Sequence, residues 1–290
     1  MLIRVVSLAL IVLALYKIVH TILFRRTYYI ATPRVSKCSL GGLTTSQQIP
    51  TIIHQSWKTE QVPPRFVGWQ KSWLDLHPAW KYILWTDAQN LDLVKKHFPW
   101  FLARYLSFKE NIKRVDSVRY MYMFKFGGFY ADLDVECLAD HTPLTYCGGV
   151  IVPLMSDPNE FLTDLDRHNS PNAWIGSIPG HPFWLFLLGE IMVHPETTAE
   201  YTTGPVALHD ALQKYDSAIY DPENLFGGIR YTEPGLVFPY DWRHLDKKCY
   251  AHASNIVRDE AACKAKFNLS NSYAITYWSH SWEENPWWTS

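Results

Sequence analysis

The chain has 290 residues, a formal net charge of −1 and 19% charged residues. No basic excess is available to grip a phosphate backbone, so the composition excludes nucleic-acid binding as a predicted function. Thirteen Trp residues are a high count, and Trp stacks on nucleobases and sugar faces as well as filling cores. The length allows one large core with appendages.

The N-terminus differs from the rest of the chain. Residues 1–24 are mainly apolar, and their length suits a bilayer span of about 20 residues. A cleaved signal peptide is the alternative, but no small-x-small cleavage site follows the apolar run, and Arg25 and Arg26 do. We therefore predict a retained transmembrane anchor at 1–24, a stem at 25–48 and one folded domain at 49–290.

The orientation of this anchor is predicted differently by two features. Basic residues after the span outnumber those before it, and by the positive-inside tendency the domain is then cytosolic. An Asn-x-Ser sequon at Asn268 fits a lumenal domain instead.

The five cysteines leave several pairings open. Cys137 with Cys147, and Cys249 with Cys263, are close enough in sequence to pair, which leaves Cys38 over. Five free thiols are the alternative, because connectivity cannot be read from sequence.

The predicted elements of the domain alternate between strands and helices. In chain order we predict a strand at 51–55, a helix at 64–78, a strand at 80–85, helices at 87–98 and 111–126, strands at 129–135 and 148–155, and helices at 181–194 and 204–215. Thr86 or Asp87 caps the second helix and Gly127 ends the third. This alternation predicts an α/β domain with a mainly parallel sheet, in which ligands bind at the carboxyl ends of strands.

The stretch GGFYADLDVE, residues 127–136, carries the main candidate site. On a strand, Tyr130, Asp132 and Asp134 share one face. Gly127 and its neighbour Gly128 have no side chains and let a ligand approach the backbone. Paired carboxylates are suitable ligands for Mg²⁺ or Mn²⁺. Phosphate oxygens and water then complete the coordination shell of the ion. That arrangement neutralises a leaving diphosphate.

Two further features bear on this site. A second Asp-x-Asp, Asp164 to Asp166, has no glycine pair or strand before it, and we interpret it as a solvated surface. Asp116 and Arg119 lie at i, i+3 on the helix that leads to the glycine pair. One interpretation is an exposed ion pair that contributes little to stability. The other is a carboxylate and a guanidinium that bind sugar hydroxyls beside a metal-diphosphate site.

The segments IPTIIHQSWKT, HPAWKYILWTD, RVDSVRYMYMFKFGGFYADLDVE and SHSW together resemble a known family. They are similar to the glycosyltransferases of the family 32 type that share a DXD sugar-binding region. That family includes fungal initiating α-1,6-mannosyltransferases, inositol phosphoceramide mannosyltransferases and lactosylceramide α-1,4-galactosyltransferases. The resemblance covers residues 49–282, and D-x-x-R followed by G-G-x-Y-x-D-x-D is highly specific.

The resemblance implies a GT-A fold, a nucleotide-sugar donor (GDP-mannose or a UDP-hexose), Mn²⁺ or Mg²⁺, and retention of anomeric configuration. It implies that Asp134 ligates the metal and that Asp132 contacts the ribose or sugar. The other implied residues are Asp116, Arg119, Gly128 and Tyr130 for the donor sugar, His54, Gln55 and Trp57 for the nucleotide, Ser281 for the metal, and Trp282 for the diphosphate.

This chain departs from the family at one place. Many members have a His pair shortly before the terminal Ser-Trp, where this chain has Thr276 and Tyr277, with His280 directly before the serine. A metal or diphosphate role for His280 is therefore an open expectation. The segment beginning at Thr203 matches one that lines the acceptor side in the family.

Several aromatic residues have a structural interpretation as well. Trp57 and Trp85 are equally expected in the core, and His54 is alternatively a hydrogen-bonded buried histidine. An acceptor platform formed by Trp174, Trp184, Trp287 and Trp288 competes with core or membrane-facing packing.

We predict a metal-dependent retaining hexosyltransferase, of the mannose or galactose/glucose type, acting on a glycan or glycolipid acceptor. The resemblance favours a single-pass protein of the Golgi or ER membrane with a lumenal catalytic domain. A sugar-binding relative that has lost turnover is the main alternative, and a metal-dependent phosphoesterase is a weaker one.

Overall fold

The computed structural model describes residues 34–35, 48–156, 167–215, 223, 225–240 and 260–278. The predicted anchor at 1–24 lies outside these residues, as does nearly all of the stem. In the part of the chain that is described, no helix is long and apolar enough to cross a membrane.

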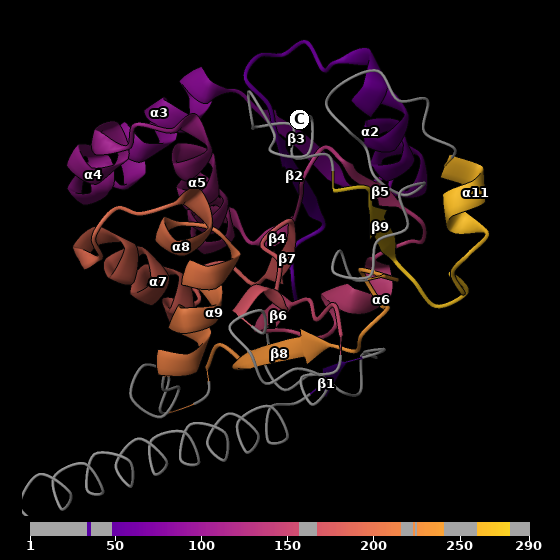
Figure 1. The fold of residues 1–290 in the computed structure, drawn as a ribbon. Helices are drawn as coiled ribbons and strands as arrows, with labels where there is room; N and C mark the ends of the chain where they lie inside the picture. The colour runs from indigo at the N-terminus through magenta and orange to yellow at the C-terminus, as the bar shows by residue number, and fades with distance from the viewer. Residues whose placement is uncertain are drawn as a thin grey trace, which may run out of the picture.

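A seven-stranded mixed sheet forms the centre of the domain (Figure 1). Its strands, in spatial order, are β1 (Arg34–Val35), β8 (Ile229–Thr232), β6 (Val150–Val152), β7 (Trp174–Ser177), β4 (Gly128–Ala131), β2 (Ile52–Ser56) and β3 (Lys81–Trp85). Both pairings of β7 are antiparallel, and the other four are parallel. The predicted α/β domain with a mainly parallel mixed sheet is confirmed.

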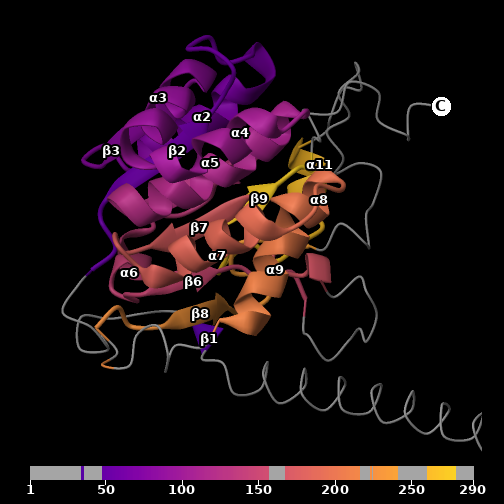
Figure 2. The ribbon, with the colours of Figure 1, turned by 90° about the vertical axis from the view of Figure 1, so that its left-hand side faces the viewer.

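Helices cover the sheet on both faces (Figures 1 and 2). The described helices are α2 (Pro64–Leu76), α3 (Asp87–His97), the 3₁₀ helix η2 (Pro99–Phe101), α4 (Leu102–Ser107), α5 (Asn111–Phe126), α6 (Thr142–Thr145), α7 (Pro182–Val193), α8 (Ala199–Thr202), α9 (Pro205–Lys214) and α11 (Glu260–Lys264). Helices α5, α7 and α9 pack on one face. On the other side lies α2, beside a two-stranded antiparallel sheet of β5 (Val135–Cys137) and β9 (Ala274–Thr276).

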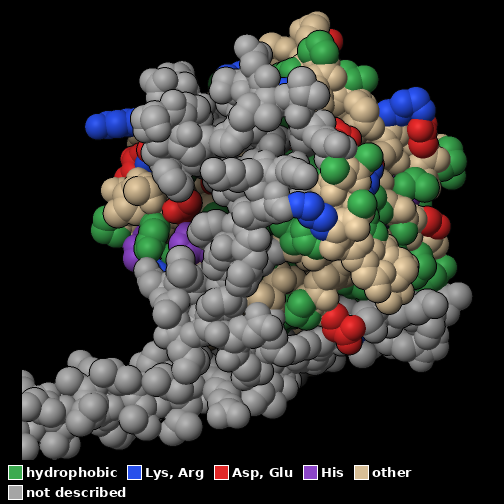
Figure 3. Space-filling view, turned by 45° about the vertical axis from the view of Figure 1, so that its right-hand side comes forward, with side chains coloured by type: hydrophobic (Ala, Val, Ile, Leu, Met, Phe, Trp, Pro, Cys, Tyr) green, Lys and Arg blue, Asp and Glu red, His purple; other side chains and the backbone are tan. Residues whose placement is uncertain are grey.

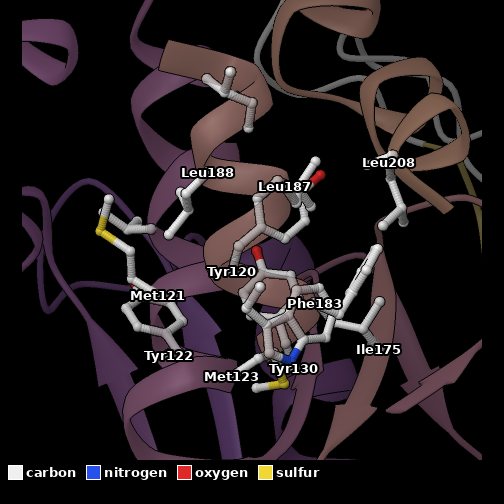
Figure 4. Packing of buried hydrophobic residues seen from close by; sticks show 14 of the residues in the cluster. Tyr120, Met121, Tyr122, Met123, Tyr130, Ile175, Phe183, Leu187, Leu188 and Leu208 are labelled. Carbon is white, nitrogen blue, oxygen red and sulfur yellow. The ribbon is translucent and has the colours of Figure 1, made fainter. Parts of the chain in front are cut away.

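Alternation along the strands sends side chains into two cores. Tyr130 and Ile175 face the core under α5 and α7, which Figure 4 shows together with Tyr120 and Phe183. Phe129 and its neighbour on β7, Trp174, face the opposite core. Trp174 and Trp184 are fully buried, so the acceptor-platform interpretation is wrong for these two. Trp287 and Trp288 lie outside the described residues.

Two predicted helix ends are confirmed. The Thr86 side chain caps α3 and forms a capping box with Gln89, which satisfies backbone N–H groups left free at a helix start. Helix α5 ends at Gly127, whose φ is 63°, a left-handed conformation that glycine adopts without steric cost.

The predicted strand at 129–135 is wrong in its second half. Strand β4 ends at Ala131, residues 132–134 form a turn, and the chain then enters the other sheet as β5. The turn is held by a hydrogen bond from Val135 N to Asp132 O (3.1 Å). Asp132 and Asp134 therefore do not share one strand face with Tyr130, although they do follow the carboxyl end of β4.

The fold itself requires the glycine pair. A Cβ on Gly128 would lie 2.5 Å from Ile52 O, and one on Gly127 would lie 2.7 Å from Pro179 N. The chain packs on its own backbone at both positions, so the fold requires the absence of a side chain there, and the approach of a ligand stays a prediction.

The cysteines contradict one of the two pairings that the sequence allows, whereas the other, between Cys249 and Cys263, agrees with the disulfide-bonded state of Cys263. The Cys137 thiol is free and buried, whereas Cys147 and Cys263 are disulfide-bonded. The pairing of Cys137 with Cys147 is therefore wrong, and so is the expectation of five free thiols. Cys38 and Cys249 lie outside the described residues.

Figure 3 views the molecule turned by 45° from Figure 1 and shows acidic and basic side chains interspersed on the part of this surface that is described. This agrees with the balanced composition of the chain.

Candidate functional site

Asp132 lies at the carboxyl end of β4 with its side chain 31% exposed. Tyr130 Oη donates to Asp132 Oδ1 at 2.6 Å, and Gln55 Nε2 donates to the Asp132 carbonyl at 3.2 Å. Burial raises the pKa of this carboxyl to about 6, against the lowering effect of Arg119 and with a further rise from Asp134. The side chain is thus fixed on one side and open to a ligand on the other.

Asp116 and Arg119 form a buried ion pair, which contradicts the interpretation as an exposed one. They are 4% and 2% exposed, and Arg119 Nη2 lies 3.0 Å from Asp116 Oδ1. The same nitrogen lies 3.3 Å from Asp132 Oδ1, and the guanidinium stands 4.6 Å from the centre of the Tyr130 ring. One arginine therefore joins the carboxylate on α5 to the first aspartate of the Asp-x-Asp pair.

Three protein groups hydrogen-bond or pair with the Asp116 carboxylate. Asn172 Nδ2 donates to its Oδ1 and Thr203 Oγ1 donates to its Oδ2, both at 3.0 Å, and Arg119 completes the set. Burial raises the pKa of Asp116, opposed by these three neighbours. Sequence reasoning missed Asn172, because an isolated Asn before an unpredicted strand carries no signal.

Asp134 lies in the turn after β4, partly buried. Its backbone carbonyl accepts from Tyr277 N at 3.3 Å, just after β9, so the C-terminal strand ends beside the Asp-x-Asp pair. His280, Ser281 and Trp282 lie outside the described residues.

The donor set at this edge fits a hard divalent cation. Asp132 and Asp134 supply carboxylate oxygens at partly exposed positions, and Mg²⁺ and Mn²⁺ prefer such ligands together with phosphate and water. Arg119 Nε is buried and has no hydrogen-bond partner among the described residues.

His54 and Gln55 are fully buried and hydrogen-bonded within the protein. His54 Nε2 lies 2.9 Å from Gly127 O, and Trp85 Nε1 donates to His54 Nδ1 at 3.0 Å. Burial lowers the pKa of this imidazole to about 4. Both ring nitrogens are engaged, which supports the interpretation as a satisfied core histidine. Gln55 accepts from Tyr82 Oη at 2.8 Å while it holds the Asp132 carbonyl.

Trp57 lies directly after β2, with its ring partly buried. It contacts Phe66 edge-on, with ring centroids 5.3 Å apart. The position is at the carboxyl end of β2, and a nucleotide contact there stays a prediction. Asn268 is exposed, and its Oδ1 accepts from Ser270 N at 3.2 Å, so the sequon stands on the surface.

A second cluster of metal-ligand residue types lies behind the turn. Side-chain atoms of His77, Cys137 and His141 all lie within 4.8 Å of one another, and all three residues are buried. Burial raises the pKa of the Cys137 thiol to about 12, which opposes the thiolate that metals require.

The hydrogen bonds of this cluster leave no ring nitrogen for a metal. Trp174 Nε1 points at His141 Nε2 at 3.2 Å, and because an indole N–H only donates, His141 Nε2 is the acceptor. Its Nδ1 therefore carries the proton and donates to Ala139 O at 2.9 Å. His77 Nε2 accepts from the backbone N–H of His141 at 2.9 Å, while its Nδ1 faces Trp73 O. The cluster is a satisfied structural network.

The curated relatives include inositol phosphoceramide mannosyltransferase 3 of Schizosaccharomyces pombe, 38% identical over 56% of this chain and 44% of that protein. Inositol phosphoceramide mannosyltransferase 2 of the same yeast is 31% identical over 68% of this chain and 56% of that protein. Mannosyl phosphorylinositol ceramide synthase SUR1 of Saccharomyces cerevisiae is 35% identical over 65% of this chain and 47% of that protein.

The chain spans about half the length of these relatives. Among solved structures, the PaToxG glycosyltransferase aligns with a TM-score of 0.46 at 15% identity, over 62% of this chain and 74% of that one. Residues 63–146, which contain Asp116, Arg119 and both aspartates of the pair, match the family described as "Glycosyltransferase sugar-binding region containing DXD motif". The resemblance seen in the sequence is confirmed, since residues 63–146 match that family and the curated relatives include mannosyltransferases.

Proposed function

We propose that the chain is a metal-dependent, retaining mannosyltransferase of the GT-A type that uses a nucleotide sugar and a glycolipid acceptor. The observation that carries the proposal is the buried Arg119 joined to both Asp116 and Asp132 at the carboxyl end of β4. The names of the relatives favour mannose as the sugar and inositol phosphoceramide as the acceptor. GDP-mannose is then the expected donor, with a UDP-hexose as the alternative.

The roles of the chain's own residues follow from their positions. Asp134 would hold Mn²⁺ or Mg²⁺, which when bound neutralises charge on the leaving nucleotide diphosphate. Asp132, fixed by Tyr130 and Arg119, accepts hydrogen bonds from ribose or sugar hydroxyls on its exposed side. Arg119 contributes a permanent positive charge close to that position, because a guanidinium stays protonated.

The described residues offer no carboxylate in a position that marks it as a nucleophile. We therefore propose attack by the acceptor hydroxyl on the face from which the nucleotide departs, with the departing phosphate as the base. This route retains the anomeric configuration without a covalent sugar–protein intermediate.

A donor panel tests the proposal. The full chain, purified in detergent, is incubated with Mn²⁺ and each of GDP-mannose, UDP-galactose and UDP-glucose, with and without inositol phosphoceramide. We expect mannosyl transfer from GDP-mannose. Mn²⁺-dependent binding of the donors without hydrolysis or transfer would instead identify a sugar-binding relative without turnover, and hydrolysis of a simple phosphodiester would identify a phosphoesterase.

Placement in the Golgi or ER membrane, with a single N-terminal anchor and a lumenal domain, belongs to the same proposal. Protease treatment of sealed microsomes tests it, since a lumenal domain stays intact until detergent is added. Digestion of the domain in sealed vesicles would overturn the lumenal orientation and favour the charges that follow the span.

A further inference from the structure

Four residues close a hydrogen-bonded ring beneath the Asp-x-Asp pair. Asn172 Nδ2 donates to Asp116 Oδ1 and to Tyr120 Oη, each at 3.0 Å. Tyr120 Oη donates to the carbonyl of Thr203 at 2.7 Å, and Thr203 Oγ1 returns to Asp116 Oδ2 at 3.0 Å. Residues from α5, the segment before β7 and the corner between α8 and α9 are thereby locked together.

All four members of the ring are buried, between 0% and 7% exposed. A buried network in which each donor meets an acceptor rigidifies the residues around it. Loss of one member would leave a buried partner without a hydrogen bond. A buried unsatisfied polar group lowers the free energy of unfolding more than the loss of an exposed hydrogen bond does. The ring is therefore expected to hold one arrangement.

Arg119 connects this ring to the candidate site. Its Nη1 donates to the carbonyl of Asn172 at 2.8 Å, its Nη2 pairs with Asp116, and the same Nη2 reaches Asp132. Two ring members therefore determine where the guanidinium lies, and the guanidinium in turn faces the aspartate that we propose for donor binding.

Thr203 is the ring member that comes from a distant part of the chain. It ends α8, and Gly204 follows it in a tight corner, where a Cβ would lie 2.9 Å from Glu200 Cα. The segment before α8 is tied to α5 as well, because Lys113 Nζ donates to Glu196 Oε1 at 2.9 Å and to Thr197 O at 2.6 Å. Lys113, Asp116 and Tyr120 lie on one stripe of α5.

We infer that Thr203 is a positioning residue for donor binding: its hydroxyl fixes the Asp116 carboxylate, and through it Arg119 beside Asp132. This inference rests on the proposed function. It means that the α8–α9 corner, to which the sequence assigned an acceptor-side place, acts on the donor side of the site.

Thr203→Val tests the inference, because valine keeps the shape of threonine and removes only the hydroxyl. The full chain in detergent is assayed with Mn²⁺, GDP-mannose and inositol phosphoceramide. We expect the KM for the donor to rise about tenfold or more, as for a lost hydrogen bond to a charged group, with the KM for the acceptor unchanged. Thr203→Ser, which restores the hydroxyl, should return the donor KM to near the wild-type value.

Thr202→Val is the matched control. Thr202 is the preceding residue, equally buried at 1%, and its hydroxyl accepts from Thr197 N rather than reaching Asp116. Its donor KM should stay at the wild-type value. If Thr203→Val does not fold, Tyr120→Phe opens the same ring at the Thr203 carbonyl, and we expect a smaller rise in donor KM.

The outcomes separate the two levels of inference. Transfer by the wild type with an unchanged donor KM in Thr203→Val, even with a lowered melting temperature, would overturn the positioning role alone. An equal rise in Thr202→Val would do the same, since it would reflect general loosening of the corner. A wild-type chain that neither transfers sugar nor binds the donor would overturn the proposed function itself.

Discussion

Two clusters of titratable side chains lie on either side of the segment that joins β4 to β5, and they differ in charge. The first joins Asp116, Arg119 and Asp132 in a charged network whose last member is 31% exposed. The second, His77, Cys137 and His141, is buried and uncharged. By residue type alone, the second cluster is the better candidate for a metal site. Its ring nitrogens are already hydrogen-bonded, however, so the first cluster is the better candidate in the structure.

The difference lies in which groups are able to exchange partners. Trp174 offers His141 an N–H that only donates, so the imidazole is committed to one tautomer and both nitrogens are used. Asp132 keeps part of its carboxylate in solvent, and Arg119 cannot lose its charge. A cluster that is fully satisfied internally stabilises the fold, whereas one with open oxygen ligands is able to bind.

The largest expected effect comes from Asp134→Asn. Removal of one carboxylate from the proposed metal-ligand pair should lower the proposed mannosyl transfer by about 10³-fold, since a bound dication contributes several kcal/mol to charge stabilisation. The melting temperature should not change. Asp140→Asn is the control, because Asp140 is an exposed carboxylate beside His77, and its activity should match the wild type. Wild-type activity in Asp134→Asn would end the metal-site interpretation.

Chelation distinguishes the two clusters directly. EDTA should abolish transfer, and added Mn²⁺ should restore it, in the wild type and in Cys137→Ser alike. Metal analysis of the purified wild type should find no tightly bound zinc. Stoichiometric zinc that disappears in Cys137→Ser would show that the His-Cys-His cluster is a metal centre after all.

Arg119→Gln tests the charged network through stability as well as activity. It leaves the buried Asp116 carboxylate without its cation, which should cost about 3–5 kcal/mol of unfolding free energy, and transfer should fall with it. Arg167→Gln breaks another pair, with Asp210, whose side chains are 22% and 34% exposed. Its cost should be about 1 kcal/mol or less. If urea unfolding gives the same loss of unfolding free energy for Arg119→Gln and Arg167→Gln, the Arg119 pair is no more important to stability than a partly exposed pair.

The sequence predicted the long helices and the site edge because these rest on local signals. Thr86 with Gln89, and Gly127 after sixteen helical residues, mark helix ends without any tertiary contact. The strand that leads to Asp132 was predicted for the same reason, although Asp132 was placed on that strand and not after it. The turn at 132–134 was not predicted, because it depends on β9, more than 130 residues later, pairing with β5.

The histidines show why residue roles were harder to predict. His54 carries no sequence mark of the indole N–H that meets its Nδ1 from β3, and Asn172 gives no sign that it would hold Asp116 across 56 positions. Both facts come from long-range packing. The family resemblance supplied Asp116 and Arg119 as a pair, but their burial and their link to Thr203 required the fold.

Trp174→Phe sharpens the interpretation of the neutral cluster. It removes the donor to His141 Nε2 and leaves a buried acceptor unsatisfied, which should cost about 1–3 kcal/mol in urea unfolding. Donor KM and kcat should not change, since no link of the charged network is touched. Loss of transfer at full stability would mean that the two clusters are functionally coupled.

The smallest effect is the pH dependence that His141 contributes. Burial, and to a lesser degree the charge of His77, lowers the pKa of His141 from 6.5 to about 3. The unfolded chain therefore takes up a proton that the folded chain refuses, so this stability is present above pH 6.5 and is lost as the pH falls. Between pH 7.5 and 5.5 one such group costs about 1.4 kcal/mol.

His141→Asn isolates that contribution, because asparagine keeps a donor near Ala139 O and does not titrate. The loss of unfolding free energy between pH 7.5 and 5.5 should be smaller in the variant than in the wild type by about that amount. Asp140 and His77 are titratable groups that face this imidazole, and both are retained in the variant. Equal losses would mean that His141 is protonated in the folded chain, and the tautomer assigned from Trp174, with the closed cluster built on it, would then be wrong.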